Sequence, residues 1–135
     1  MSIAFRHTIP VLRIFDERKA KEFYRGFLGF SIDWEHRFEP KTPLYMQVSR
    51  GKIVLHLSEH YGDGTPGTVT VVVVTGIEKY LAELQQKKYK YYRPGIQLQP
   101  WNAKELAVID PFGNRIRFSE FIKPAGTSRK KRRKP

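Results

Sequence analysis

The chain has 135 residues, of which 40% are hydrophobic and none is cysteine. This length favours one domain with a core of its own, and the lack of cysteine excludes disulfides and thiolate chemistry. The net charge is +12, no apolar run approaches the ~18 residues of a membrane span, and residues 1–15 lack the apolar segment of a leader. We therefore expect a globular, cytoplasmic protein without a membrane partner.

The first half of the chain predicts one helix among four strands. Asp16 is suited to cap a helix over residues 17–27, where apolar side chains recur at helical spacing. Pro10 lies within the first expected strand and indicates an edge or a bulge there. On the second strand, alternation puts Ile32, Trp34 and His36 on one face. Apolar residues with a period of two predict the strands over residues 3–13, 30–38, 44–49 and 53–58.

The second half repeats this order after a linker at residues 59–67, which is rich in Gly, Asp and Pro. The next strand is an unbroken apolar run, a pattern typical of a strand buried on both faces. Alternation of strands and helices in both halves indicates a weak internal repeat. The elements expected before the final hairpin are a strand over residues 69–75, a helix over 77–87 and a short strand over 89–93.

A hairpin ends the folded part of the chain. Its strands are expected over residues 104–109 and 114–121. Pro111 sets the backbone of the turn between them, and Gly113 tolerates a positive φ there. A period of two puts Arg117 on the face opposite the apolar side chains of the last strand. From these patterns alone we predict an α+β fold with a mostly antiparallel sheet.

Three motifs resemble those of the vicinal oxygen chelate superfamily, which includes glyoxalase I, bleomycin resistance proteins and dioxygenases. They are Phe23-Tyr24-x3-Leu28-Gly29-Phe30, Asp110-Pro111-x-Gly113-Asn114 and Gln99-Pro100-Trp101, the last of which is most similar to the bleomycin resistance branch. The resemblance covers residues 3–122. It implies two βαβββ modules that form an open sheet, with helices on one face and a ligand cleft on the other. In the bleomycin resistance branch, two chains pair and build two clefts.

We accordingly expect one domain over residues 1–122, with modules at about 3–60 and 68–122. Residues 123–135 are expected to be a basic disordered tail, because the run from Arg129 to Lys134 has no apolar residue to bury. That run carries half of the net charge. It is either a solubilising tail without a specific partner or the one place where nucleic acid would bind.

The resemblance also allows a test for a metal site. Metal-dependent members of the superfamily take one His or Glu ligand from each of four strands. His7 and His56 match the first two positions, whereas the third falls at Val69 and the fourth at Arg117. Because arginine keeps its positive charge, it repels a metal cation. We therefore expect no metal and no other cofactor, with His7 and His56 as the remaining candidate ligands, and binding rather than catalysis.

Without a metal, the expected cleft is a container for a ligand. Aromatic planes with a few polar groups suit a flat amphipathic molecule. The resemblance implies that the tryptophan of the Gln-Pro-Trp motif stacks on the planar part of bleomycin-type antibiotics, which are sequestered and not degraded. The candidate ligand-binding residues are Trp34, Phe38, Tyr45, Gln47, His56, Trp101 and Arg117.

Three functions remain open. The first is a metal-independent homodimer that sequesters a bleomycin-like or other aromatic small molecule, and the second is a metal-dependent glyoxalase-like lyase or isomerase, or a dioxygenase, of the same fold. The third is association with nucleic acid through the basic tail. The positive charge of the body opposes a cationic drug, so an anionic or aromatic metabolite is an alternative ligand.

Overall fold

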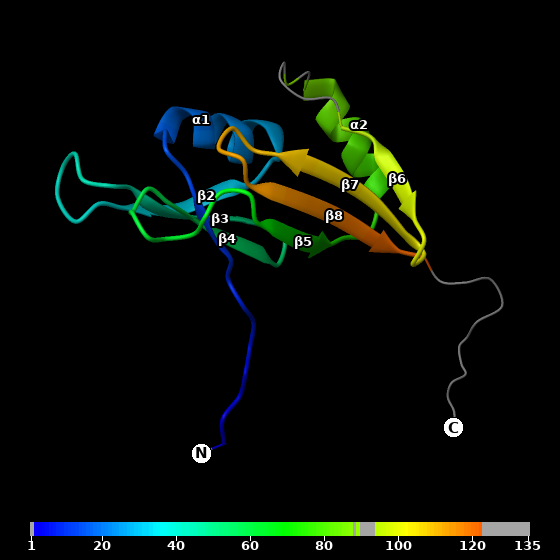
Figure 1. Ribbon diagram of the computed structural model, residues 1–135, viewed down its shortest axis with the longest axis horizontal. Helices are drawn as coiled ribbons and strands as arrows, with labels where there is room; N and C mark the ends of the chain where they lie inside the picture. The colour runs from blue at the N-terminus through cyan, green and yellow to red at the C-terminus, as the bar shows by residue number, and fades with distance from the viewer. Residues whose placement is uncertain (1, 88, 90–93, 123–135) are drawn as a thin grey trace. The chain divides into compact units, whose positions relative to one another are not determined.

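The computed structural model describes residues 2–87, 89 and 94–122, and the chain divides into two compact units (Figure 1). The first unit contains residues up to Thr70 together with Ile109–Arg115, and the second contains Val71–Val108 and residues from Ile116 onward. The basic tail and most of the short strand expected at residues 89–93 lie outside the described residues.

Each half of the chain builds a four-stranded sheet of the same connectivity. The strand orders are β1-β4-β3-β2 and β5-β8-β7-β6, so in both sheets the first strand pairs with the fourth. This confirms the α+β architecture of repeated βαβββ modules. The strands are β1 (Val11–Arg13), β2 (Ser31–His36), β3 (Tyr45–Arg50), β4 (Ile53–Ser58), β5 (Val69–Val73), β6 (Ile96–Gln99), β7 (Ala103–Ile109) and β8 (Arg115–Phe121).

The first helix begins where the sequence predicts it. The Asp16 side chain accepts a hydrogen bond from the Lys19 N–H at 2.8 Å and so caps α1 (Glu17–Lys21). The helix then continues as a π-helical segment, η1 (Glu22–Phe27), whose Phe23, Tyr24 and Phe27 are buried. Figure 1 shows this helix over one face of the first sheet. None of the helices in the described parts of the chain is long and apolar enough to cross a membrane.

The turn between β7 and β8 is fixed by the carboxylate of Asp110. Its Oδ1 accepts hydrogen bonds from the backbone N–H groups of Phe112 and Asn114, each at 2.8 Å. Its Oδ2 accepts the Tyr24 hydroxyl at 2.6 Å and the Asn114 side-chain amide at 2.8 Å. Gly113 has a φ of 97° in this turn. The predicted turn is thus confirmed, and Asp110 ties it to η1 within the first unit.

The prediction of a strand over residues 3–13 is wrong for most of that range. Only Val11–Arg13 pairs, in parallel with β4. The preceding segment is in no strand, and Ile3 and Phe5 are 86% and 97% exposed. Pro10 lacks an N–H for a sheet ladder, and residues 2–9 meet no partner strand in the part of the chain that the structure describes.

The expectation for the fifth strand is also wrong. Its valines alternate, since Val72 is buried while Val69, Val71 and Val73 are 41%, 51% and 61% exposed. In this unit α2 (Ile77–Lys87) packs on one face of the sheet, where Tyr80 meets Phe118 with ring centroids 4.9 Å apart. A single chain therefore covers one face of β5 and leaves the other open. The strand β6 was not expected from the sequence.

Candidate ligand-binding site

The first sheet has one covered face and one open face. Met46, Val48 and Leu57 are fully buried on the face that α1 and η1 cover. The alternate residues on the same strands, Tyr45 and Gln47 on β3 and His56 on β4, are only partly buried. These half-buried aromatic and polar side chains form the open face, as the alternation along β3 and β4 predicts.

A β-bulge in β2 adds two side chains to the open face. The pairing register shifts between Ile32, which is opposite Val48, and Trp34, which is opposite Gln47. Asp33 is the extra residue, and the bulge turns both Asp33 and Trp34 toward the open face. Ile32 shares the covered face with Val48, so the expectation that Ile32 and Trp34 share a face is wrong.

Three rings meet on this face. The planes of Trp34 and Tyr45 are nearly parallel, at 16°, with centroids 6.1 Å apart. His56 lies edge-on to both, at 5.4 Å from Trp34 and 5.2 Å from Tyr45. Trp34 is 43% exposed. The aromatic cluster, by which we mean Trp34, Tyr45 and His56, therefore presents ring surface to solvent rather than filling a core.

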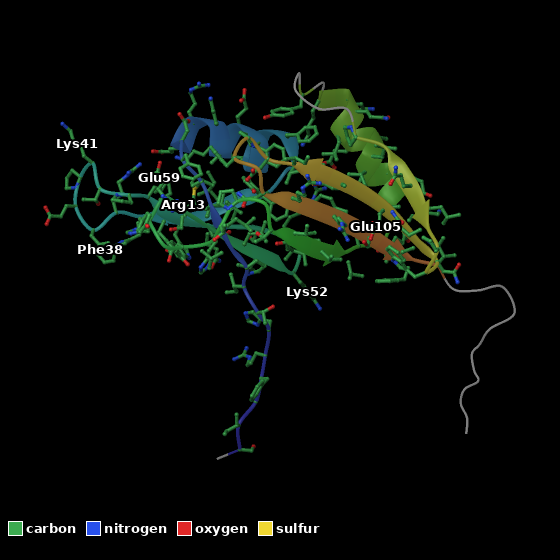
Figure 2. All side chains as sticks on the ribbon, viewed as in Figure 1. Arg13, Phe38, Lys41, Lys52, Glu59 and Glu105 are labelled. Atoms are coloured by element: carbon green, nitrogen blue, oxygen red, sulfur yellow. The ribbon has the colours of Figure 1, made fainter. Side chains whose placement is uncertain are left out.

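Phe38 extends the aromatic cluster toward the end of the sheet. Its ring lies 4.6 Å from that of His36 and 5.9 Å from that of His60. His60 in turn lies 6.3 Å from Tyr45. Figure 2 shows Phe38 on the connection between β2 and β3, where its side chain is 74% exposed. The structure thus brings five predicted residues to one surface: Trp34, Phe38, Tyr45, Gln47 and His56.

A chain of hydrogen bonds runs across the open face. Nδ1 of His56 is 2.7 Å from the Tyr45 hydroxyl, and Nε2 of His56 is 2.9 Å from Oε1 of Gln47. The Gln47 amide donates to Asp33 at 3.0 Å. Burial lowers the pKa of His56 below its usual 6.5, so the imidazole is neutral at pH 7. Burial, followed by the nearby Asp63 carboxylate, raises the pKa of Tyr45 above its usual 10.0.

The linker after β4 folds back beside Tyr45. The Ser58 hydroxyl donates to Asp63 at 2.8 Å and accepts the His60 N–H at 3.0 Å. Gly64 follows with a φ of +69°, and a Cβ there would lie 2.9 Å from the Val11 carbonyl oxygen. Close contact with β1 therefore requires glycine at this position.

Sequence reasoning missed three residues of this surface, namely Asp33, His60 and Asp63. Asp63 had a local signal, because it stands between two glycines in a linker that must turn sharply. Asp33 had none, because a regular period of two assigns it to the covered face.

The remaining predicted residues lie elsewhere in the chain. Trp101 follows β6 in the second unit and is 56% exposed. Arg117 is exposed on β8, on the face opposite Phe118 and α2. Two acidic residues near it in the sequence hydrogen-bond to other groups: Glu105 accepts the Ser119 hydroxyl at 3.0 Å, and Glu120 accepts the Ile77 N–H at 3.0 Å.

The candidate metal ligands do not converge with further ligands. His7 is exposed and belongs to no strand. Within residues 2–87, 89 and 94–122 there is no group of three or more His, Asp or Glu side chains that could hold a metal ion. Both ring nitrogens of His56 are already hydrogen-bonded.

Comparison with known proteins identifies the fold. The family model described as glyoxalase superfamily protein matches residues 1–124. A bleomycin-binding protein complexed with bleomycin is 20% identical with a TM-score of 0.68, over 87% of this chain and 100% of that one. TnmS3, an antibiotic binding protein from Streptomyces sp. CB03234, is 18% identical with a TM-score of 0.64, over 90% and 100%. A putative glyoxalase family protein from Bacillus anthracis is 19% identical with a TM-score of 0.63, over 90% and 100%. No curated protein sequence matches.

Proposed function

The chain belongs to the glyoxalase superfamily, and we propose that within it this protein is a metal-independent homodimer that sequesters an aromatic small molecule, bleomycin-like or otherwise. The observation that carries the proposal is the half-exposed aromatic cluster on the open face of the first sheet. Trp34 presents 43% of its surface there beside partly buried Tyr45 and His56. Exposed ring faces with a few fixed polar groups are the usual lining of a small-molecule site.

The solved structures of similar fold support a binding role. One of them is a bleomycin-binding protein in complex with bleomycin, and another is an antibiotic binding protein. Their identities to this chain are 20% and 18%, so they support the class of function through the shared fold and leave the ligand to be found by experiment.

Independence from metal is supported by the hydrogen bonds of His56. A histidine binds a metal through the lone pair of a ring nitrogen. In this structure Nδ1 is 2.7 Å from the Tyr45 hydroxyl and Nε2 is 2.9 Å from Gln47 Oε1, so a metal could bind either nitrogen only if one of these hydrogen bonds were broken. At the position where the superfamily's eighth strand supplies a carboxylate, this chain has Arg117, which cannot take that role.

Pairing of two chains is supported by the apolar surface that one chain leaves uncovered. Ile3 and Phe5 are 86% and 97% exposed in the N-terminal segment, and Val71 and Val73 are 51% and 61% exposed on β5. Exposed apolar side chains at alternate positions favour burial against a second sheet or strand. A second copy of the chain would supply such a surface.

Fluorescence titration tests the proposal. The chain has two tryptophans, so a Trp101→Phe variant makes emission report on Trp34 alone. Titration of this variant with metal-free bleomycin, and with planar aromatic compounds of different charge, is expected to change Trp34 emission at micromolar ligand. Trp34→Ala should abolish binding in a calorimetric assay. Tyr61→Ala, at an exposed aromatic residue outside the cluster, should leave binding unchanged.

Two results would contradict the proposal. Absence of binding by every aromatic ligand would reject sequestration. Stoichiometric zinc, nickel or iron in the purified protein, together with loss of that metal in a His56→Ala variant, would instead favour the metal-dependent lyase or dioxygenase.

A further inference from the structure

We infer that the hydrogen-bond chain from Asp33 through Gln47 and His56 to Tyr45 sets the polarity of the binding surface, so that it selects planar aromatic ligands bearing a cation or an N–H donor. The inference rests on the proposed function and specifies its ligand class. Asp33 acts in two ways: it orients Gln47 by accepting its amide hydrogen bond, and its carboxylate adds a negative charge beside the aromatic cluster.

The direction of the chain is decided at Asp33. Hydrogen bonds from Gln47, and secondly from Ser49, lower the pKa of Asp33, so the group is an ionised carboxylate that can only accept. Gln47 must therefore turn its Nε2 donor toward Asp33. This leaves Oε1, which only accepts, facing His56 at 2.9 Å.

The same logic fixes the tautomer of His56. Because Oε1 of Gln47 accepts, Nε2 of the imidazole carries the proton. The imidazole is neutral, so Nδ1 holds a lone pair and accepts the Tyr45 hydroxyl at 2.7 Å. Each donor in the chain thus points from Tyr45 toward Asp33.

The consequence lies at Tyr45. Its single hydroxyl hydrogen is used by His56, so the phenolic oxygen has only lone pairs left for a ligand. The Asp33 carboxylate lies at one side of the cluster, and Asp63 is near enough to Tyr45 to raise its pKa. The ring faces of the cluster attract positive charge, and the lone pairs of the phenolic and carboxylate oxygens attract N–H donors.

One cation, Arg13, shares the open face of the first sheet, because it pairs with Ser58, which pairs with Tyr45. Arg13 pairs with Ser58, at the far edge of the sheet from Trp34. Its guanidinium lies over the Phe15 ring, 4.7 Å from the centroid. On the covered face, Lys21 is held by Glu17 and Glu35 at 2.7 and 2.9 Å. Asp33 is nevertheless the negative charge that hydrogen bonds join to the cluster, through Gln47, although the net charge of the chain is +12.

A matched set of planar probes tests ligand selection. We would measure binding of 1-methylquinolinium, quinoline and quinoline-2-carboxylate by calorimetry. The expected order of affinity is cation first, neutral base second and anion last. If the anion binds as tightly as the cation and Trp34→Ala abolishes both, the aromatic site is upheld and the inference on polarity is overturned. If none of the three binds, the proposed function itself fails for this ligand class.

Two variants separate charge from hydrogen bonding. Asp33→Asn removes the charge. It is expected to lower the affinity for 1-methylquinolinium by roughly two- to fivefold, the range of exposed ion pairs, and to change the affinity for quinoline little. Tyr45→Phe removes the acceptor oxygen and is expected to lower the affinity for 1-methylquinolinium by roughly two- to tenfold. Glu39→Gln is the matched control, because it also removes one negative charge, but from the exposed β2–β3 connection and from a residue that takes no part in the hydrogen-bond chain. Equal losses in Asp33→Asn and Glu39→Gln would overturn the role of Asp33.

A readout without ligand completes the test. Nitrogen NMR of histidine-labelled protein is expected to show His56 protonated at Nε2 and unprotonated at Nδ1. Asp33→Ala, which frees Gln47 to turn, is expected to convert this to a mixture of tautomers, whereas Glu39→Gln should not. A predominant Nδ1–H tautomer in the unmodified protein would overturn the inference.

Discussion

Replacement of Tyr24 by phenylalanine is expected to destabilise the fold through Asp110. Tyr24 is fully buried, and its hydroxyl donates to the Asp110 carboxylate at 2.6 Å. A hydrogen bond to a charged acceptor contributes about 1.5–3 kcal/mol. Tyr24→Phe should lower the free energy of unfolding by that amount and no more, because the Asp110 carboxylate keeps its other three donors. Asp110→Ala leaves a buried hydroxyl and two backbone N–H groups of the turn without their acceptor, so about 3–5 kcal/mol is expected.

Urea unfolding of both single variants and the double variant measures the coupling. Once Asp110 is absent, removal of the Tyr24 hydroxyl should cost little, so the double variant should be about as unstable as Asp110→Ala. Tyr61→Phe, at a residue that is 96% exposed, is the control and should change nothing. A loss below about 0.5 kcal/mol in Tyr24→Phe, the size of an ordinary surface change, would refute this account of the turn.

The same pair predicts sensitivity to alkali. Burial, followed by the Asp110 charge, raises the pKa of Tyr24 well above its usual 10.0. The contribution of Tyr24 to stability is complete below pH 10 and declines above it, by about 1.4 kcal/mol per pH unit, until the folded-state pKa is reached. Stability measured between pH 9 and 11 should fall less steeply in Tyr24→Phe.

Three further outcomes are expected. Gly64→Ala should lower the free energy of unfolding in urea by about 1–3 kcal/mol, because its Cβ would meet the Val11 carbonyl at 2.9 Å. The loss should exceed that of Gly62→Ala, where φ is also positive but nothing lies within 4 Å. Equal losses in the two variants would contradict the role of this contact. His56 should titrate below 6.5 by NMR, since burial disfavours its charged form, and its contribution to stability should decline as pH falls through the folded-state pKa; a midpoint above 6.5 would contradict this. Deletion of residues 2–8 should convert a dimer to a monomer in sedimentation experiments, and an unchanged mass would remove the support that Ile3 and Phe5 give to pairing.

The local patterns of this sequence predicted most elements because they depend on neighbours in the chain. The cap at Asp16, the turn at Gly113 and the alternation along β3 are set within a few residues, and all three are confirmed. The bulge at Asp33 was not predictable by the same means. A bulge inserts one residue without altering composition, and after it every side chain changes face. The sequence predicted Trp34 as a residue of the candidate site, whereas it did not predict Asp33, which is linked to His56 through Gln47.

Two errors share a physical cause. The apolar alternation of residues 3–9 predicted a paired strand, and the unbroken run of β5 predicted burial on both faces. The single chain leaves Phe5 97% exposed and Val73 61% exposed. An apolar pattern records that a surface is to be buried and carries no information about which molecule buries it. Both errors therefore point to the same conclusion as the proposed dimer, since a second chain would satisfy both patterns.

The charge of the whole chain is a poor guide to the ligand of the aromatic cluster. Half of the net charge lies in the run from Arg129 to Lys134, and free charges in 0.15 M salt are screened over about 8 Å. A bound ligand responds mainly to groups within that distance, and those on the open face include the Asp33 carboxylate, the Tyr45 phenolic oxygen and the exposed ring of Trp34. Any positive charge beyond that distance slows the approach of a cation without altering these contacts, so it acts on the association rate more than on dissociation. The overall charge thus does not exclude a cationic ligand, because the proposed selection depends on the few side chains of the open face, to which the bulge in β2 adds Asp33 and Trp34.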